Sequence, residues 1–467
     1  MSARFQPLKG VSTAVLALTL CACGSMAPDY QRPAAPVAAS FGSENAGNTA
    51  ASAIEWRQFF SDARLQSLIT LALANNRDLR IAVLNIEQAR AQYDIRRADQ
   101  WPTVNAGLSG SRVPTSSGGI SSTYSAGVLV TAYELDLFGR VRSLGEAALA
   151  QYLASEEARK AAQISLVATV ATSYLALQGD EELLRVTLET LRTRETSLRL
   201  IKLRFDNGAS SLIDLRQAES LLESARVALA QATRQRALDE NALVLLLGQP
   251  LPATLPEGVP ITAAATLPEL AAGLPSDLLA RRPDIRQAEQ QLIAANANIG
   301  AARAAFFPKI TLTASLGSAS TQLGDLFKAG STAWSFAPQL LQPIFDGGRN
   351  QANLKVAEVG RDIATAQYER AIQSAFREVA DALAGRATLG EQLRAQEALV
   401  RAEQDRYRLA ELRYRNGVAS YLDALDAQRS LFAAQQALVQ TQVQYQQNLV
   451  TLYRVLGGGW STDGPAN

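Results

Sequence analysis

The chain repeats itself, and this duplication constrains its fold more than any other feature of the sequence. The pentapeptide NRDLR, which starts at Asn76, matches RPDIR, which starts at Arg282, at a spacing of 206 residues. The Asn-Gly pair at Asn207 recurs at Asn416, at a spacing of 209 residues. Self-similarity over such a distance predicts two repeats of one structural unit.

The matches define the domain organisation that we expect. Repeat 1 covers residues 64–250, repeat 2 covers 277–457, and a proline-rich linker over 251–276 joins them. A short flexible tail follows over 458–467. A chain of 467 residues, of which 47% are hydrophobic, is long enough for two such units with a sizeable core.

Each repeat presents the same order of secondary-structure signals. A proline-free helical run comes first, then two alternating segments, then a very long helix, a tight turn and a returning helix. The helical runs are 79–98 and 284–305. The alternating segments are 103–112 and 123–138, which form the predicted hairpin 103–138, and 309–318 and 332–345, which form the predicted hairpin 309–345.

The alternating segments fit strands that cross a membrane. From Ile310 to Gly317, apolar residues alternate with Thr, Ser and Gly, which is a period of two. A tilted membrane-spanning strand needs about ten residues of this kind. A small soluble hairpin is the alternative, because the signal of a single barrel strand is weak. The aromatic residues that we expect to form an interfacial belt are Trp101, Tyr124, Tyr133 and Trp334.

The long helical segments predict an antiparallel coiled coil. The segments 140–205 and 349–414 contain 66 residues each and no proline, so that a continuous helix would be about 100 Å long. Apolar residues recur every seven positions from Val170 onward, and the returning segments 211–247 and 420–456 continue this spacing. The lengths favour one long helix beside two shorter helices that stack end to end.

The N-terminus has the pattern of a lipoprotein signal. Basic residues precede the apolar stretch 11–20, which is too short to span a bilayer. We therefore expect a signal peptide over 1–22, and Cys23 is the predicted lipidation site because the sequence around it resembles the bacterial lipobox. An ordinary cleaved signal with an incidental cysteine is the alternative. Residues 23–63 follow as a lipidated tether, and the composition of 27–55 predicts an extended segment with little packing.

The composition excludes several classes of chemistry. The chain has no histidine, and its two cysteines are Cys21 and Cys23, so no histidine-dependent catalysis and no cysteine metal cluster is expected in its body. Its 45 Lys and Arg residues balance 44 Asp and Glu residues, which argues against a nucleic-acid partner. We expect no enzymatic activity, no cofactor and no bound metal.

Several motifs occur here in a specific order. They are the lipobox at Cys23, the run PDYQRP over 28–33, the duplicated element order and the segment YRNGVASYLDALDAQR over 414–429. Together they resemble the TolC-type outer-membrane efflux proteins, and above all the lipidated OprM/NodT-like branch of that family. The resemblance implies a mainly α fold, in which coiled-coil helices form a periplasmic α-barrel. Four strands alone cannot close a barrel in lipid, so two or three copies are needed. The resemblance implies three, a homotrimer in which each chain contributes four strands to a twelve-stranded β-barrel.

The resemblance further implies the function. It predicts the outer-membrane channel of a tripartite efflux system, of the RND type or a similar one, in a Gram-negative bacterium. Such a passive duct has a gated periplasmic end and works with a periplasmic adaptor and an inner-membrane pump, embedded in outer-membrane lipid. The alternative is a periplasmic lipoprotein adaptor. An adaptor should carry one hairpin inside split β domains, whereas this sequence predicts two hairpins that each follow a strand pair.

Both helix-to-helix turns carry candidate residues. Gly208 and Gly417 suit the left-handed position that ends a helix. The tetrapeptides 211–214 and 420–423 have the spacing of a capping box, with Asp in place of Glu. By the resemblance, a periplasmic adaptor meets the exposed turn residues Asn207, Gly208, Ala209, Asn416, Gly417 and Val418.

The resemblance also places a periplasmic gate in repeat 2. Its predicted residues are Leu422, Asp423, Asp426 and Arg429. Asp426 lies two turns inside the helix, so helix capping does not explain it, and a solvated helix face is the alternative. Three Asp426 carboxylates near one axis repel one another, so that a closed ring needs a cation, protonation or an arginine partner. The equivalent residue of repeat 1 is Gln217, and we therefore expect one hairpin to move on opening while the other stays.

Overall fold

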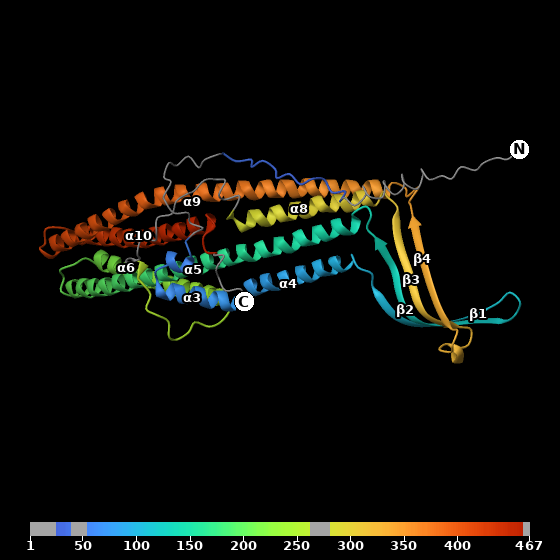
Figure 1. Ribbon diagram of the computed structural model, residues 1–467. Helices are drawn as coiled ribbons and strands as arrows, with labels where there is room; N and C mark the ends of the chain where they lie inside the picture. Colours follow the sequence, from blue (N-terminus) through green and yellow to red (C-terminus); the bar gives the residue numbers. More distant parts are fainter. Residues whose placement is uncertain (1–24, 39–53, 262–280, 461–467) are drawn as a thin grey trace, which may run out of the picture. The chain divides into compact units, whose positions relative to one another are not determined.

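The computed structural model describes residues 25–38, 54–261 and 281–460 (Figure 1). The predicted signal peptide and Cys23 lie outside the described residues, as do parts of the predicted tether, linker and tail. The elements in chain order are α2 (Trp56–Phe59), α3 (Ala63–Asn75), α4 (Arg77–Ala98), β1 (Val104–Pro114), β2 (Ile120–Leu135), α5 (Arg140–Asp206), α6 (Leu212–Leu247), α8 (Pro283–Ala304), β3 (Lys309–Ser320), the 3-10 turn η3 (Leu323–Asp325), β4 (Thr332–Leu341), α9 (Arg349–Arg415) and α10 (Tyr421–Val455).

The chain folds into two compact units, and each takes segments from both sequence repeats. The strand unit contains Met1–Ala35, Leu84–Glu157 and Arg286–Ala371. The helical unit contains Pro36–Val83, Ala158–Ile285 and Ile372–Asn467. Each repeat therefore gives its strand pair to one unit and most of its helical hairpin to the other.

The strand unit is built on one antiparallel sheet with the order β1-β2-β3-β4. The pairing runs from Val104 opposite Val130 to Lys309 opposite Leu341. All four predicted strands are present, which confirms the reading of a period of two. The expectation that the last strand reaches residue 345 is wrong, because β4 ends at Leu341. Pro343 follows two residues later, and proline has no N–H to continue a ladder.

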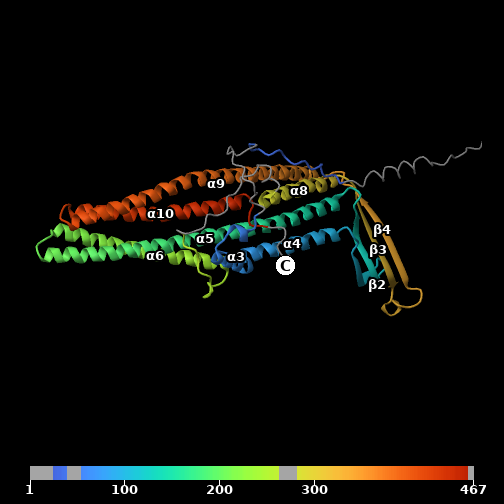
Figure 2. The same ribbon diagram turned by 60° about the vertical axis from the view of Figure 1, so that its left-hand side comes forward.

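Two long helical hairpins contain most of the helical residues. α5 and α6 form one pair and α9 and α10 the other, and both views show each pair side by side (Figures 1 and 2). α5 and α9 contain 67 residues each, so that the predicted helix boundaries hold to within one residue. One window of α5 is apolar enough by composition to cross a membrane, but more than half of it is buried inside the protein, as in a core helix.

The helical unit has a hydrophobic core to which α2, α3, α5, α6, α9 and α10 contribute. Phe59 of α2 stacks on Tyr453 of α10 with 4.0 Å between the ring centroids. The sequence reasoning missed α3 and placed α2 in the predicted tether. The signal for α3 was present, since Asp62 caps the helix by accepting from the N–H groups of Arg64 and Leu65.

The returning helices stack end to end with the shorter helices, as their lengths predict. Asn76 donates from Nδ2 to the carbonyl O of Leu246 at 2.9 Å, where α6 ends and α4 begins. Arg282 donates from Nη1 to the carbonyl O of Val455 at 3.0 Å, where α10 ends and α8 begins. The first residues of the two matched pentapeptides therefore make equivalent contacts, each with the last turn of a returning helix.

Two segments that the composition predicts to be loose are packed where the structure describes them. Arg32 donates from Nε and Nη2 to the two carboxylate oxygens of Glu289 in α8, at 2.6 and 2.8 Å. The hydroxyl of Tyr30 donates to the same carboxylate at 3.1 Å. At the start of the predicted tail, the Nζ of Lys160 lies 4.6 Å from the ring centroid of Trp460. The expectation of a tether with little packing is therefore wrong for Tyr30 and Arg32, which contact α8.

Candidate functional site

The two helix-to-helix turns have the same backbone geometry. Gly208 and Gly417 both have φ +71°, the left-handed conformation that the sequence predicts for them. The N–H of Gly208 bonds to the carbonyl of Phe205 at 2.9 Å, and the N–H of Ala209 bonds to that of Arg204 at 2.7 Å. This pair of bonds is a Schellman motif, and the turn at Gly417 repeats it. Both long helices therefore end in a tight, well-defined turn.

The returning helices begin with the predicted capping boxes. The backbone N–H of Asp214 bonds to Ser211 Oγ, and the carboxylate of Asp214 accepts from the N–H of Ser211. Ser420 and Asp423 form the same reciprocal pair in α10. Partial burial opposes ionisation of Asp214, but hydrogen bonds from Ser211 and Ser210 hold the pKa of Asp214 below its ordinary value. Asp423 thus has a structural task besides its predicted place in the gate.

The residues predicted to meet an adaptor are all solvent-exposed. They are Asn207, Gly208, Ala209, Asn416, Gly417 and Val418. The side chains of Asn207 and Asn416 bend back and donate from Nδ2 to carbonyl groups of their own helices, at 2.7 and 2.8 Å. The backbone of each turn is therefore fixed from within, while its outer surface stays free within the part of the chain described here.

Asp426 has an arginine partner inside its own hairpin. Its Oδ2 accepts from Nη2 of Arg406, a residue of α9 that also donates to Glu403 at 3.1 Å and to Ser430 at 3.2 Å. The side chains of Arg406 and Asp426 are 45% and 59% exposed, so that water screens the pair and its contribution to stability is small. Leu422 lies one turn earlier on α10 and is 53% exposed. A closed ring of Asp426 carboxylates needs a cation, protonation or an arginine partner. Arg406 supplies the arginine partner.

Arg429 lies beside a second, buried arginine. Arg194 of α5 is 4% exposed, and its Nη1 donates to the carbonyl of Leu221 and to Ser224 Oγ, both at 2.8 Å. Burial and then the charge of Arg429 lower the pKa of Arg194 from its ordinary value. Arg429 also lines an open groove with side chains of α6, namely Leu212, Ile213, Arg216, Gln217 and Ser220. Arg429 therefore faces the hairpin in which Gln217 stands at the position of Asp426.

The ends of the two hairpins are joined by direct contacts. Tyr421 and Leu425 of α10 are buried in a cluster with Ile201 and other apolar residues of the first hairpin. Arg204 donates from Nη1 to the hydroxyl of Tyr414 at 2.8 Å, and its guanidinium lies 4.9 Å from the centroid of that ring. Any motion that separates the hairpin ends has to break these contacts.

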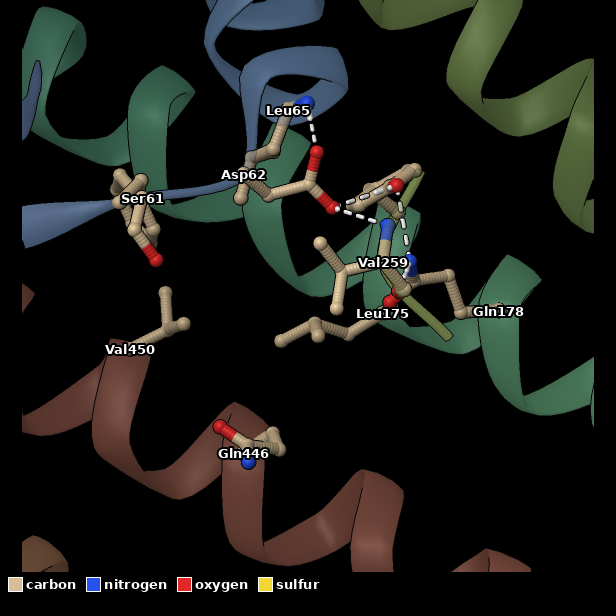
Figure 3. A pocket seen from close by; sticks show the side chains of 10 residues that line it. Ser61, Asp62, Leu65, Leu175, Gln178, Val259, Gln446 and Val450 are labelled. Atoms are coloured by element: carbon tan, nitrogen blue, oxygen red, sulfur yellow. Dashed lines mark hydrogen bonds between the residues drawn. The ribbon is translucent and has the colours of Figure 1, made fainter. Parts of the chain in front are cut away.

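A separate cavity of about 60 Å³ lies where α3 begins, against α5 and α10 (Figure 3). Its polar centre is Asp62, whose Oδ2 accepts from the hydroxyl of Tyr174 at 2.9 Å and from the N–H of Val259 at 3.2 Å. Gln178 donates to the same hydroxyl at 2.8 Å. Burial and then Asp62 raise the pKa of Tyr174. These polar groups satisfy one another, so the arrangement clamps the segment after α6 onto the core.

No cluster of three or more acidic or cysteine side chains suited to a metal ion occurs in residues 25–38, 54–261 and 281–460. The sequence reasoning missed Arg406, the partner of Asp426, and a simple rule would have found it. Residues equally far from the turn of an antiparallel hairpin face each other, and Arg406 and Asp426 lie ten positions before and after Asn416.

Comparison with known proteins gives consistent results. The family model of the outer membrane efflux protein matches residues 68–249 and 274–458. The toluene efflux pump outer membrane protein TtgC of Pseudomonas putida is 51% identical over 463 residues, which cover 96% of this chain and 95% of that protein. The outer membrane protein OprJ of Pseudomonas aeruginosa is 48% identical over 464 residues, or 97% of either chain. The crystal structure of the open state of the MtrE outer membrane channel of Neisseria gonorrhoeae is 44% identical, with a TM-score of 0.87 over 93% of this chain and 98% of that one.

Proposed function

Since the chain belongs to the outer membrane efflux protein family and is an outer-membrane efflux channel, we propose that three copies form one passive duct from the periplasm to the exterior. Each copy supplies four strands to a shared β-barrel in the outer membrane and two helical hairpins to a hollow cylinder in the periplasm. The duct performs no chemistry. It provides a path for the cargo, and its helical end closes that path when no cargo is delivered.

The observation that carries this proposal is the pair of free edges of the sheet. Among the described strands, β1 and β4 each pair on one side only. In hydrocarbon each unpaired N–H or C=O group costs several kcal/mol, so that an open sheet is unstable in a membrane. Pairing β4 of one copy with β1 of the next removes every edge. Large apolar side chains on these strands are more than half exposed and suit a lipid-facing surface: Leu108, Trp334, Phe336 and Leu340.

The gate of the duct is assigned to the second hairpin. Leu422, Asp423, Asp426 and Arg429 lie on the first three turns of α10, next to the turn at Asn416. In the closed state Arg406 neutralises Asp426, and the contact of Arg204 with Tyr414 holds the second hairpin against the first. We expect opening to move the second hairpin outward, because it carries Asp426 where the first hairpin has the uncharged Gln217.

Two partners complete the system. We assign the exposed turns at Asn207 and Asn416 to the tip of a periplasmic adaptor, which connects the duct to an inner-membrane pump. The cargo class that we infer is small apolar molecules, because the relative TtgC is named as a toluene efflux protein. Cys23 carries the lipid anchor, and more than one acyl chain is needed for stable attachment to the outer membrane.

The gate is tested by single-channel recording of the purified, lipidated protein in planar bilayers. Asp426→Ala removes the ion pair with Arg406 and weakens the closed ring, so we expect the conductance of the closed state to rise severalfold. The matched control is Gln217→Ala at the equivalent position of the first hairpin, which should leave conductance unchanged. An Asp426→Ala channel that conducts like the unaltered one would remove Asp426 from the gate without affecting the assignment as a duct.

A further inference from the structure

One layer in the core of the first hairpin is charged. Along α5, Leu177 and Leu184 occupy one of the two core positions of the seven-residue repeat, and the other core position lies three residues after each. After Leu177 this second position is Asp180. Asp180 is only 9% exposed, so its carboxyl group lies inside the coiled coil, where an acid needs a partner.

The facing helix is also polar at this level. In α6 the core run of Leu222, Leu229 and Leu243 is interrupted by Arg236, and the second core position three residues later is Asp239. Arg236 is already engaged, since it forms ion pairs with Glu240 at 2.9 Å and with Glu181 at 3.4 Å. The core layer therefore holds two acids, Asp180 and Asp239, and one arginine, Arg236, which also pairs with acids outside the layer.

A third helix closes the layer without adding charge. Gly179, the residue before Asp180, leaves no room for a Cβ atom because Val443 of α10 packs against it. The α10 segment 439–447 contains no charged residue. The charged groups that act on Asp180 are therefore Asp239, Arg236 and Glu181. Oδ2 of Asp180 is buried and has no hydrogen-bond partner among the described residues.

We propose that Asp180 and Asp239 share one proton and form a pH-operated latch between α5 and α6. With the proton in place, one carboxyl group donates a hydrogen bond to the other, and the layer is closed. When the proton leaves to solvent, two carboxylates face each other beside apolar side chains, and the layer loosens. Because the layer lies 26 residues before the end of α5, its loosening softens the shaft of the hairpin and leaves the turn intact.

The direction of the pH effect follows from the surroundings of Asp180. Burial and then Asp239 raise the pKa of Asp180 to about 7. An acid whose pKa is raised by folding binds its proton more tightly in the folded state. Its stabilising contribution is complete below its ordinary pKa of about 4 and is lost as the pH rises to about 7. This direction is opposite to that of the capping acid Asp214.

Hydrogen exchange of the full-length lipidated protein in nanodiscs tests the latch between pH 5 and 8, after correction for the intrinsic exchange rates. We expect the opening equilibrium of amides near Asp180 and Asp239 to rise with pH, by at most about tenfold per pH unit for one proton, and to level off above about pH 7. Asp180→Asn mimics the protonated acid. Its amides should stay as protected as those of the unaltered protein at low pH, and this protection should not depend on pH. Glu189→Gln, which changes an exposed acid of α5 outside this layer, should retain the pH dependence.

A second measurement keeps the test valid if one variant fails to fold. The unaltered protein should show the infrared band of a protonated carboxyl group at pH 6, and both Asp180→Asn and Asp239→Asn should lose that band. A flat pH profile in the unaltered protein, or an unchanged slope in Asp180→Asn, would overturn the latch. Neither readout depends on conductance, so a failure here leaves the proposed duct untouched.

Discussion

At the scale of single residues, the two repeats keep their structural contacts and differ in their charges. Asn76 and Arg282 each bind the last turn of a returning helix, although one is an amide and the other a guanidinium. By contrast, Gln217 and Asp426 occupy equivalent positions, and only the second carries a charge. The equivalent contacts are those that every copy of the unit needs to fold. The gate is therefore assigned to a position where the repeats diverge.

The capping boxes give a prediction about the turns. Ser211→Ala removes the acceptor for the N–H of Asp214 and should destabilise the start of α6 by about 1 kcal/mol. Hydrogen exchange of the first turn of α6 measures the loss, and Ser220→Ala on the same helix is the control. Because the pKa of Asp214 is lowered, the contribution of its carboxylate is present above about pH 4 and disappears as the pH falls through the lower, folded pKa.

The contact of Glu289 with the N-terminal segment gives a second prediction. Glu289→Gln keeps the size of the side chain but removes the charge that Arg32 and Tyr30 share, so residues near Arg32 should detach from α8. We expect a cost of about 1 to 2 kcal/mol, because the carboxylate is buried but Arg32 is half exposed. Hydrogen exchange of the amides near Arg32 measures the detachment, with the exposed Glu87→Gln as control. Equal exchange rates in both variants would contradict the assigned contact.

At the scale of the elements, the sequence predicts what local chemistry determines. Heptad spacing, capping residues and the two Asn-Gly turns predicted the long helices to within one residue. Contacts between distant residues left no such signal: Arg32 and Glu289 are 257 positions apart, and the composition around Arg32 suggested a loose tether. The gate residue Asp426 was named from the resemblance. Its partner Arg406 left no local signal, but the predicted turn at Asn416 sets the register that pairs the two residues.

The sheet gives a prediction at the same scale. Gly127 of β2 and Gly317 of β3 lie opposite each other, and a Cβ atom at Gly317 would collide with the carbonyl of Ala126. Gly317→Val should therefore force β2 and β3 apart and prevent barrel formation, whereas Thr311→Val in the same strand should be tolerated. Heat-resistant migration of the folded barrel in detergent gels measures the outcome. A Gly317→Val protein that migrates like the Thr311→Val protein would show that this close strand contact is not needed.

At the scale of the whole molecule, each compact unit on its own has surfaces that need a partner. In its described residues, the strand unit ends in two unpaired strand edges and exposes large apolar side chains. The helical unit carries exposed turns and a half-exposed charged pair at the predicted gate. Both features are explained when the chain is one part of a closed assembly. The division of each repeat between the two units fits this view, because strands and hairpins then serve different compartments.

The most direct test of the account is the mass of the lipidated protein released from detergent micelles or nanodiscs in a native mass spectrometer. The account predicts a particle of three chains, and predicts that Gly317→Val, which disrupts the sheet, reduces its abundance in favour of single chains. A stable particle of one chain that still conducts ions in planar bilayers would contradict the central claim, because such a chain would have to seal a membrane duct with four strands alone.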